Sequence, residues 1–241
     1  SDVCSSDLGI PFGEWGGKKL SFSLDDSRHK VVVGSSGTGK TTLLINYCLS
    51  LARAGRGFAY LDNTDCAASK TLLDALPEDS LGKVVVLDYG DEGRPLPVGL
   101  AGQSASKLMG WWVDFFVDNF GIEEQWRTRE LISYCCRAAF SEPGNTILEA
   151  LLMAKGGRQR QEILSFCYDT KTLHWWQEFE EESKGYSQSV SSFLSRMGNL
   201  ESDTHLKNTL FQRPKKEYEH KKWMDQGWIV IIRVPDRKSV V

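Results

Sequence analysis

The hydrophobic positions in the first part of the chain form short runs separated by helical patterns. The runs at 29–33, 58–62 and 83–88 are rich in β-branched or aromatic residues, which is typical of buried strands. Between them, 41–53 carries apolar residues at helical spacing and 67–76 fits a short helix closed by a proline. The order β-α-β-α-β with short links predicts an α/β fold with a parallel sheet and right-handed crossovers.

The pattern changes at about residue 104, after which no strand interrupts a long helical stretch. One helix should begin at Thr146, because Thr146 and Glu149 fit a capping box. A buried parallel strand returns at 228–234. We therefore predict an all-α subdomain, 104–224, inserted between 9–103 and 225–235 of one α/β core. The predicted helices are 104–119, 125–140, 146–154, 159–167, 173–183 and 187–197.

A glycine-rich turn joins the run 29–33 to the helix 41–53. It fits the P-loop pattern G-x-x-x-x-G-K-[ST] at every fixed position, between a predicted strand and a predicted helix. The glycines let backbone N–H groups point at phosphate oxygens, and the helix start adds free N–H groups and the positive end of its dipole. The turn reads Gly34, Ser35, Ser36, Gly37, Thr38, Gly39, Lys40, Thr41 and Thr42.

These residues predict a site for ATP and Mg²⁺. Lys40 can reach the β- and γ-phosphates and is the predicted catalytic residue, while the Thr41 hydroxyl can ligate the metal. The segment Gly9–Ser27, which alternates at Leu20 and Phe22, is expected to be a β-element or loop beside this site. The alternative is a glycine-rich turn that merely joins a strand to a helix.

Composition limits the classes of protein to consider. The chain has 241 residues, 41% of them hydrophobic, and a net charge of −3, so it lacks the overall basic character of many nucleic-acid binders. The cysteines show no C-x-x-C pair and no histidine at zinc spacing. No run approaches the roughly 20 apolar residues of a membrane span, and no signal peptide is visible.

Both ends of the chain resemble translated sequencing-adapter DNA. The codons TCA GAC GTG TGC TCT TCC GAT encode 1–7, and GAT CGG AAG AGC GTC GTG encodes 236–241. We therefore expect 1–8 and 236–241 to be artefacts, and the natural protein to continue beyond both ends of 9–235.

The order and spacing of further segments resemble the HerA/FtsK-like branch of P-loop ATPases, and within it the conjugative coupling proteins of type IV secretion. Only the P-loop is a sharp motif. The sequence departs from the family where Asp62-Asn63-Thr64-Asp65 replaces Asp-Pro-(Lys/His)-Gly, and where Asn-Pro is absent near Gly99. The matching segments are Arg28 to Gly34, Tyr60-Leu61-Asp62, Leu76-Pro77-Glu78, Val86-Leu87-Asp88, Pro95 to Leu100, Trp175 to Phe179, His205 to Leu210 and Met224 to Val230.

This resemblance implies a RecA-like core that binds ATP·Mg²⁺ between the subunits of a homo-oligomeric ring, a hexamer, and couples hydrolysis to DNA movement. It also implies a cytoplasmic location, at the inner membrane face through an anchor outside this sequence, with membrane or secretion-apparatus partners. The family's Walker B acidic pair lies beyond 234, so we expect this fragment to bind nucleotide and hydrolyse it poorly. The alternatives are a HerA-like helicase-translocase and a nucleotide-gated adaptor that binds a protein without DNA.

Other charged residues carry weaker predictions. Asp88 closes an apolar run as a Walker B Asp does, but an ordinary strand-end Asp is favoured, and Asp62 is expected nearer the nucleotide. The basic loop 155–160 fits either a DNA-phosphate contact or a helix-capping turn. The sequence does not select an arginine finger among Arg127, Arg129, Arg196 and Arg213.

Overall fold

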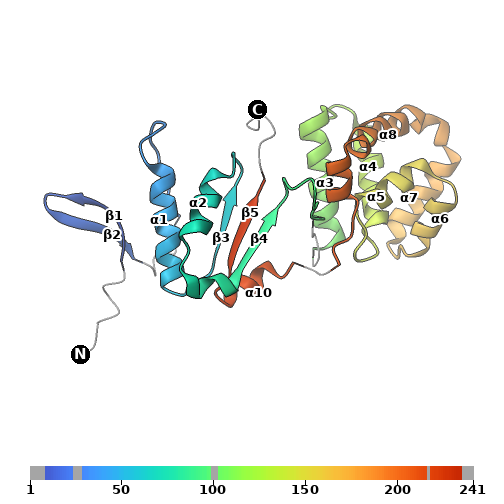
Figure 1. The fold of residues 1–241 in the computed structure, drawn as a ribbon. Helices are drawn as coiled ribbons and strands as arrows, with labels where there is room; N and C mark the ends of the chain where they lie inside the picture. The colour runs from blue at the N-terminus through green and yellow to red at the C-terminus, as the bar shows by residue number, and fades with distance from the viewer. Residues whose placement is uncertain (1–8, 24–28, 99–102, 216–217, 235–241) are drawn as a thin grey trace. The chain divides into compact units, whose positions relative to one another are not determined.

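The computed structural model describes residues 9–23, 29–98, 103–215 and 218–234, and the protein is mixed α/β (Figure 1). It forms two compact units. The first runs from the N-terminus to Asp91 and resumes at Glu219, and the second is Glu92–Tyr218. The described residues do not include the two ends, 1–8 and 236–241, that we expect to be adapter-derived. They also leave out Gly99 and Leu100 of the segment Pro95 to Leu100, which resembles the family.

The first unit contains a sheet of three parallel strands in the order β3-β5-β4. Strand β5 (Ile229–Arg233) lies between β3 (Phe58–Asp62) and β4 (Val84–Asp88) and pairs with both in register. The predicted parallel sheet is therefore confirmed for these three strands. Because β5 is central, the sheet joins segments from distant parts of the chain.

Two helices cover one face of this sheet. Helix α1 (Lys40–Arg53) and helix α2 (Ala67–Ala75) contribute Ile45, Leu49 and Leu72 to a core with Tyr60 of β3 and Ile231 of β5. A 3-10 helix, Glu78–Lys83, leads into β4, and α10 (His220–Asp225) leads into β5. The first residues of α1 and of α2 lie on the side of the sheet where the strands end (Figure 1).

The strand predicted at 29–33 is not formed. Val31 and Val33 are 85% and 88% exposed, and 29–35 has no regular secondary structure. A β-branched run becomes a strand only when a neighbour completes its hydrogen bonds and covers one face, and here the run has neither. The prediction of a strand leading into the P-loop is therefore wrong for this structure.

The segment before this run forms an antiparallel hairpin of β1 (Gly9–Trp15) and β2 (Lys18–Ser23). Gly16 and Gly17 form its turn with φ of 57° and 75°, a left-handed pair that favours glycine. Phe22 of the hairpin meets Tyr47 of α1 edge to face, with ring centroids 6.2 Å apart. The predicted β-element is therefore a hairpin packed against α1.

The second unit is all helical in its described residues. Its buried core includes Phe116, Cys135, Trp176, Phe193 and Met197, all 0–1% exposed. The predicted helices are present with ends shifted by a few residues, and α9 follows them. They are α3 (Ala105–Phe120), α4 (Trp126–Ala139), α5 (Ile147–Lys155), α6 (Arg158–Ser165), α7 (Thr170–Glu181), a 3-10 turn (Ser183–Tyr186), α8 (Ser187–Ser202) and α9 (Thr204–Leu210).

This unit begins at 92 and ends at 218, whereas the sequence placed the subdomain at 104–224. The difference has a local cause at each end. Val98 donates its N–H to the carbonyl of Thr209 at 2.8 Å, so the loop before α3 belongs with the helices. Helix α10 instead leads directly into β5. Within the described part of the chain, no helix is long and apolar enough to cross a bilayer.

Candidate nucleotide-binding site

The predicted P-loop curls through two left-handed glycines. Gly37 has φ of 80°, and Gly39, the residue just before α1, has φ of 84°. Side chains with a Cβ rarely adopt this conformation, so both positions favour glycine. At Gly34 a Cβ would lie 2.7 Å from Thr38 Oγ1, so the Thr38 side chain would have to move to admit one. The conformation of the loop therefore favours glycine at positions 37 and 39.

Hydrogen bonds within the loop hold it closed on the Ser35 carbonyl. Thr38 Oγ1 donates to this oxygen at 2.8 Å, and Lys40 Nζ donates to it at 2.6 Å. The Lys40 ammonium thus lies over the loop rather than extending into solvent. A phosphate oxygen is a stronger acceptor for this ammonium than a carbonyl, so an arriving phosphate can take its place.

The start of α1 is electrostatically suited to an anion. Gly39 has no side chain to cap the helix, and the first turn contains no acidic residue. The first N–H groups of α1 and the positive end of its dipole are therefore available to a phosphate. Thr41 and Thr42 are exposed on this turn. The Thr41 hydroxyl is a hard oxygen of the type that Mg²⁺ prefers, although the described residues hold no cluster of three His, Cys, Asp or Glu side chains around it.

The carboxylate of Asp62, which was expected near the nucleotide, accepts hydrogen bonds from residues that follow it closely in the chain. Its carboxylate accepts bonds from the Thr64 hydroxyl at 2.7 Å, the Thr64 N–H at 3.2 Å and the Ser69 N–H at 2.9 Å. Burial raises the pKa of this carboxyl, but these hydrogen bonds lower it more, so its pKa lies below the usual value. Asp62 therefore ties the end of β3 to the first turn of α2.

Asp88 is also bound to neighbouring elements. Its carboxylate accepts the N–H of Gly90 at 3.0 Å and lies 3.4 Å from Arg233 Nη1. These contacts fit the favoured interpretation of a strand-end Asp. Asp88 is thus held between Gly90 and Arg233, and its side chain remains 33% exposed.

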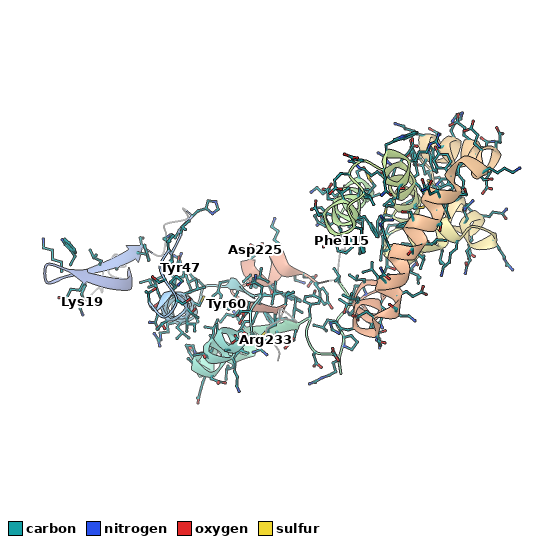
Figure 2. The ribbon with its side chains drawn as sticks, turned by 90° about the horizontal axis from the view of Figure 1, so that it is seen from above. Lys19, Tyr47, Tyr60, Phe115, Asp225 and Arg233 are labelled. Atoms are coloured by element: carbon teal, nitrogen blue, oxygen red, sulfur yellow. The ribbon has the colours of Figure 1, made fainter. Side chains whose placement is uncertain are left out.

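Arg233, which is labelled in Figure 2, lies at the carboxyl ends of the strands with Asp62 and Asp88. It was not predicted from the sequence. It ends β5 in register with both Asp62 and Asp88. Besides its contact to Asp88, its Nε donates to Ser69 Oγ at 2.9 Å, and its side chain is 18% exposed. Arg233 therefore joins the central strand to β4 and α2. The available signal was a cation directly after a buried apolar run.

The basic loop 155–160 of the second unit contains one buried cation, Arg160, and two exposed ones, Lys155 and Arg158. Arg160 is 8% exposed, and its Nε donates to the Met153 carbonyl at 2.8 Å. It also pairs with Glu180 and stacks over Trp176 at 4.8 Å. These contacts fit the helix-capping interpretation for Arg160, and they leave the choice open for the exposed Lys155 and Arg158.

The arginine-finger candidates that show contacts are held within the second unit. Arg213 pairs with Glu149 at 3.2 Å, and Arg196 donates to the Phe120 carbonyl at 3.3 Å. Arg127 lies over the ring of Trp126 at 5.1 Å. These contacts do not select one of the arginines as an arginine finger.

Comparisons with family models, with curated proteins and with solved structures found no match to this chain. The feature of this chain that bears on its function is therefore the geometry of the P-loop. One short stretch, 34–42, brings together left-handed glycines, a lysine ammonium, a threonine hydroxyl and an open helix start. The strand-end residues are not part of this stretch. Asp62 accepts a hydrogen bond from α2, and Arg233 contacts both Asp88 and α2.

Proposed function

We propose that this chain binds ATP·Mg²⁺ through residues 34–42 and is the nucleotide-binding part of a DNA-translocating motor of the conjugative coupling type. The observation that supports nucleotide binding is the loop itself. Its glycines at 37 and 39 are left-handed, it opens onto an uncapped helix start without acidic residues, and Lys40 lies over it. The motor role is supported by the resemblance of segment order.

In this proposal, the chain positions the phosphates and neutralises their charge. Backbone N–H groups of the loop and of the first turn of α1 bind phosphate oxygens, and Lys40 exchanges the Ser35 carbonyl for the β- and γ-phosphates. The Thr41 hydroxyl would hold Mg²⁺, and the metal would supply charge stabilisation at the phosphates. Because the catalytic carboxylate would come from a Walker B pair beyond residue 234, we expect this fragment to bind nucleotide and to hydrolyse it slowly.

Titration with a fluorescent ATP analogue in the presence of Mg²⁺ tests the site. Lys40→Ala removes a charge-assisted hydrogen bond and should weaken binding by about tenfold to a hundredfold. Lys19→Ala, which removes an exposed lysine from the hairpin, is the matched control and should bind as the unchanged protein does. Equal affinity of the Lys40→Ala variant would falsify the site.

DNA binding tests the motor part separately. Anisotropy of a labelled DNA duplex, measured with ATP between about 50 and 200 mM salt, should show an affinity that falls steeply as phosphate-bound counterions are released. Binding of nucleotide without any salt-sensitive DNA binding would favour the adaptor instead. Neighbouring relaxase and mating-pore genes would favour conjugation over a HerA-like role.

A further inference from the structure

The second unit contains a partly open cavity of about 470 Å³ that nothing in the P-loop proposal uses. Its walls are mainly apolar and come from α3, from the turn between α4 and α5, and from the end of α9. Its apolar lining includes Leu108 and Trp112 of α3, Phe140 and Ile147 beside the turn, and Leu210 of α9. Cavities of this size and lining are typical of small-molecule sites.

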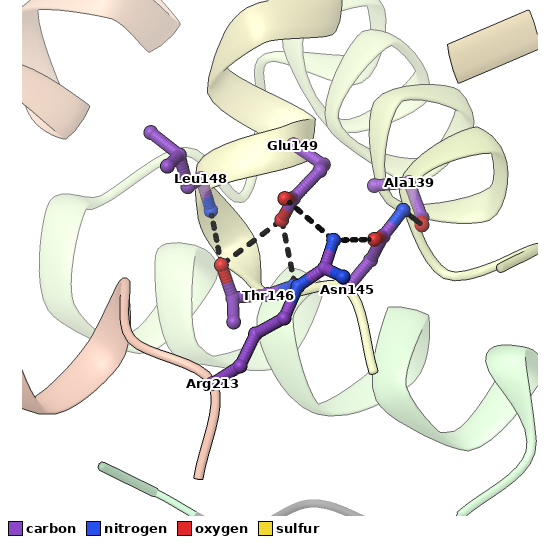
Figure 3. Close-up of polar contacts among 6 residues, drawn as sticks. All are labelled: Ala139, Asn145, Thr146, Leu148, Glu149 and Arg213. Carbon is purple, nitrogen blue, oxygen red and sulfur yellow. Dashed lines mark hydrogen bonds and ion pairs between the residues drawn. The ribbon is translucent and has the colours of Figure 1, made fainter. Parts of the chain in front are cut away.

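A polar clamp fixes the rim of this cavity (Figure 3). Arg213 Nη2 donates to Asn145 Oδ1 and to Glu149 Oε1, the latter at 3.2 Å. Glu149 Oε2 in turn accepts the N–H of Thr146 at 2.7 Å, and Asn145 Nδ2 donates to the Ala139 carbonyl at 2.8 Å. The rim is thus held by a connected set of bonds, so the cavity is preorganised.

The clamp leaves donors that a ligand can use. Arg213 lines the cavity, its side chain is 52% exposed, and its Nε and Nη1 have no acceptor among the residues that the structure describes. The charge of Arg213 is balanced by Glu149, and Glu142 also lies on the cavity wall. The rim therefore offers N–H donors without a net positive charge, which favours an uncharged acceptor over an anion.

We propose that this cavity binds a small uncharged molecule with an apolar, ring-sized body and one carbonyl or hydroxyl acceptor. The body would fill the space between Trp112 and Ile147, and the acceptor would take the free donors of Arg213. Val98 and Gln103, from the loop before α3, line the same cavity as Leu210 and Arg213. The ligand would therefore contact both the start and the end of the helical unit.

Methyl NMR on the full chain, labelled at leucine and isoleucine, tests the proposal with acetanilide as the probe. Acetanilide should shift the methyl signals of Leu108, Ile147 and Leu210. Ala105→Leu fills the cavity from α3 and should weaken binding at least about tenfold, because it removes the space for the ring. Ala59→Leu, at an exposed position of β3, is the matched control and should leave the affinity unchanged.

A second comparison keeps the proposal testable if Ala105→Leu does not fold. Arg213→Gln should weaken acetanilide binding but not the binding of ethylbenzene, which has no acceptor. Unchanged acetanilide affinity in Ala105→Leu, or shifts spread over both units, would overturn the site. Shifts at the same methyls that follow protein concentration instead of acetanilide would show that a second copy of the chain occupies the cavity, and would overturn it too.

Discussion

The guanidinium of Arg160 lies among helix ends and aromatic rings. It bonds the carbonyls of Met153 and Ala154 in the last turn of α5, and it lies over Trp176 and Phe179. The last carbonyls of a helix have no partner within the helix, so a buried donor is needed here. Arg160 meets that need from the next helix along the chain.

Arg160→Met should therefore lower the free energy of unfolding by about 2 kcal/mol, because two buried carbonyls lose their donor. Arg158→Met, two residues away and exposed, should change it by less than about 0.5 kcal/mol. Urea unfolding followed by circular dichroism measures both. Equal midpoints for the two variants would mean that the capping bonds of Arg160 contribute nothing.

The depressed pKa of Asp62 predicts a pH dependence. A carboxyl with a folded-state pKa below its unfolded value stabilises the fold above that unfolded value, about 3.9, and this contribution is lost as the pH falls through the folded pKa. Asp62→Asn should cost about 1 kcal/mol at pH 7, and the cost should shrink below about pH 4. The urea unfolding midpoints of the unchanged protein and of Asp62→Asn, measured at pH 7 and pH 3, test this prediction. A stability cost that is the same at both pH values would contradict the role of the carboxylate.

Residues whose roles are local were predictable, and residues whose roles depend on strand pairing were not. The loop 34–42 could be recognised because its chemistry lies in consecutive residues. Arg233 acquires its role only when β5 inserts between β3 and β4, which no local pattern specifies. The same pairing binds Asp88, and α2 binds Asp62, which changes what these carboxylates can do.

At the scale of elements, helix α5 depends on its first turn. Thr146 Oγ1 accepts the N–H of Leu148 at 3.2 Å, and Glu149 accepts the N–H of Thr146, so the predicted capping box is confirmed. Thr146→Ala should cost about 1 kcal/mol of stability. Thr170→Ala, at the exposed first residue of α7, should cost less than about 0.5 kcal/mol, because Asp169 caps that helix. Thermal unfolding of both variants compares them directly.

Helices were easier to predict than strands for a physical reason. A helix satisfies its own backbone, so an amphipathic period marks it wherever it packs. A strand depends on a neighbour, and the run 29–33 shows the consequence, since its valines remain exposed. The short helices α9 and α10 were missed because they span only 7 and 6 residues, too few to show a period.

At the scale of the whole molecule, the two units have separate cores. The core of the first unit includes Leu72 and Ile231, and that of the second includes Phe193 and Met197, with no described residue in both. Each core is closed by its own helices. We therefore expect each unit to respond separately to loss of its own core.

Ile231→Ala removes buried methylenes from the central strand and should destabilise the first unit by about 2–5 kcal/mol. Met197→Ala should do the same to the second unit. Hydrogen exchange of backbone amides reads the units individually, so each variant should accelerate exchange in one unit alone. Acceleration in both units by either variant would show that they unfold together.

The central place of β5 also has a consequence for synthesis on the ribosome. Strands β3 and β4 emerge early, yet they cannot hydrogen-bond to each other in the native sheet because β5 separates them. Until the entire helical unit has been translated, the inner edges of β3 and β4 remain open and apolar, which is the state of a chain most prone to aggregation. Nascent chains of this protein should therefore need chaperone protection during most of their elongation, and they should lose that need soon after β5 leaves the exit tunnel.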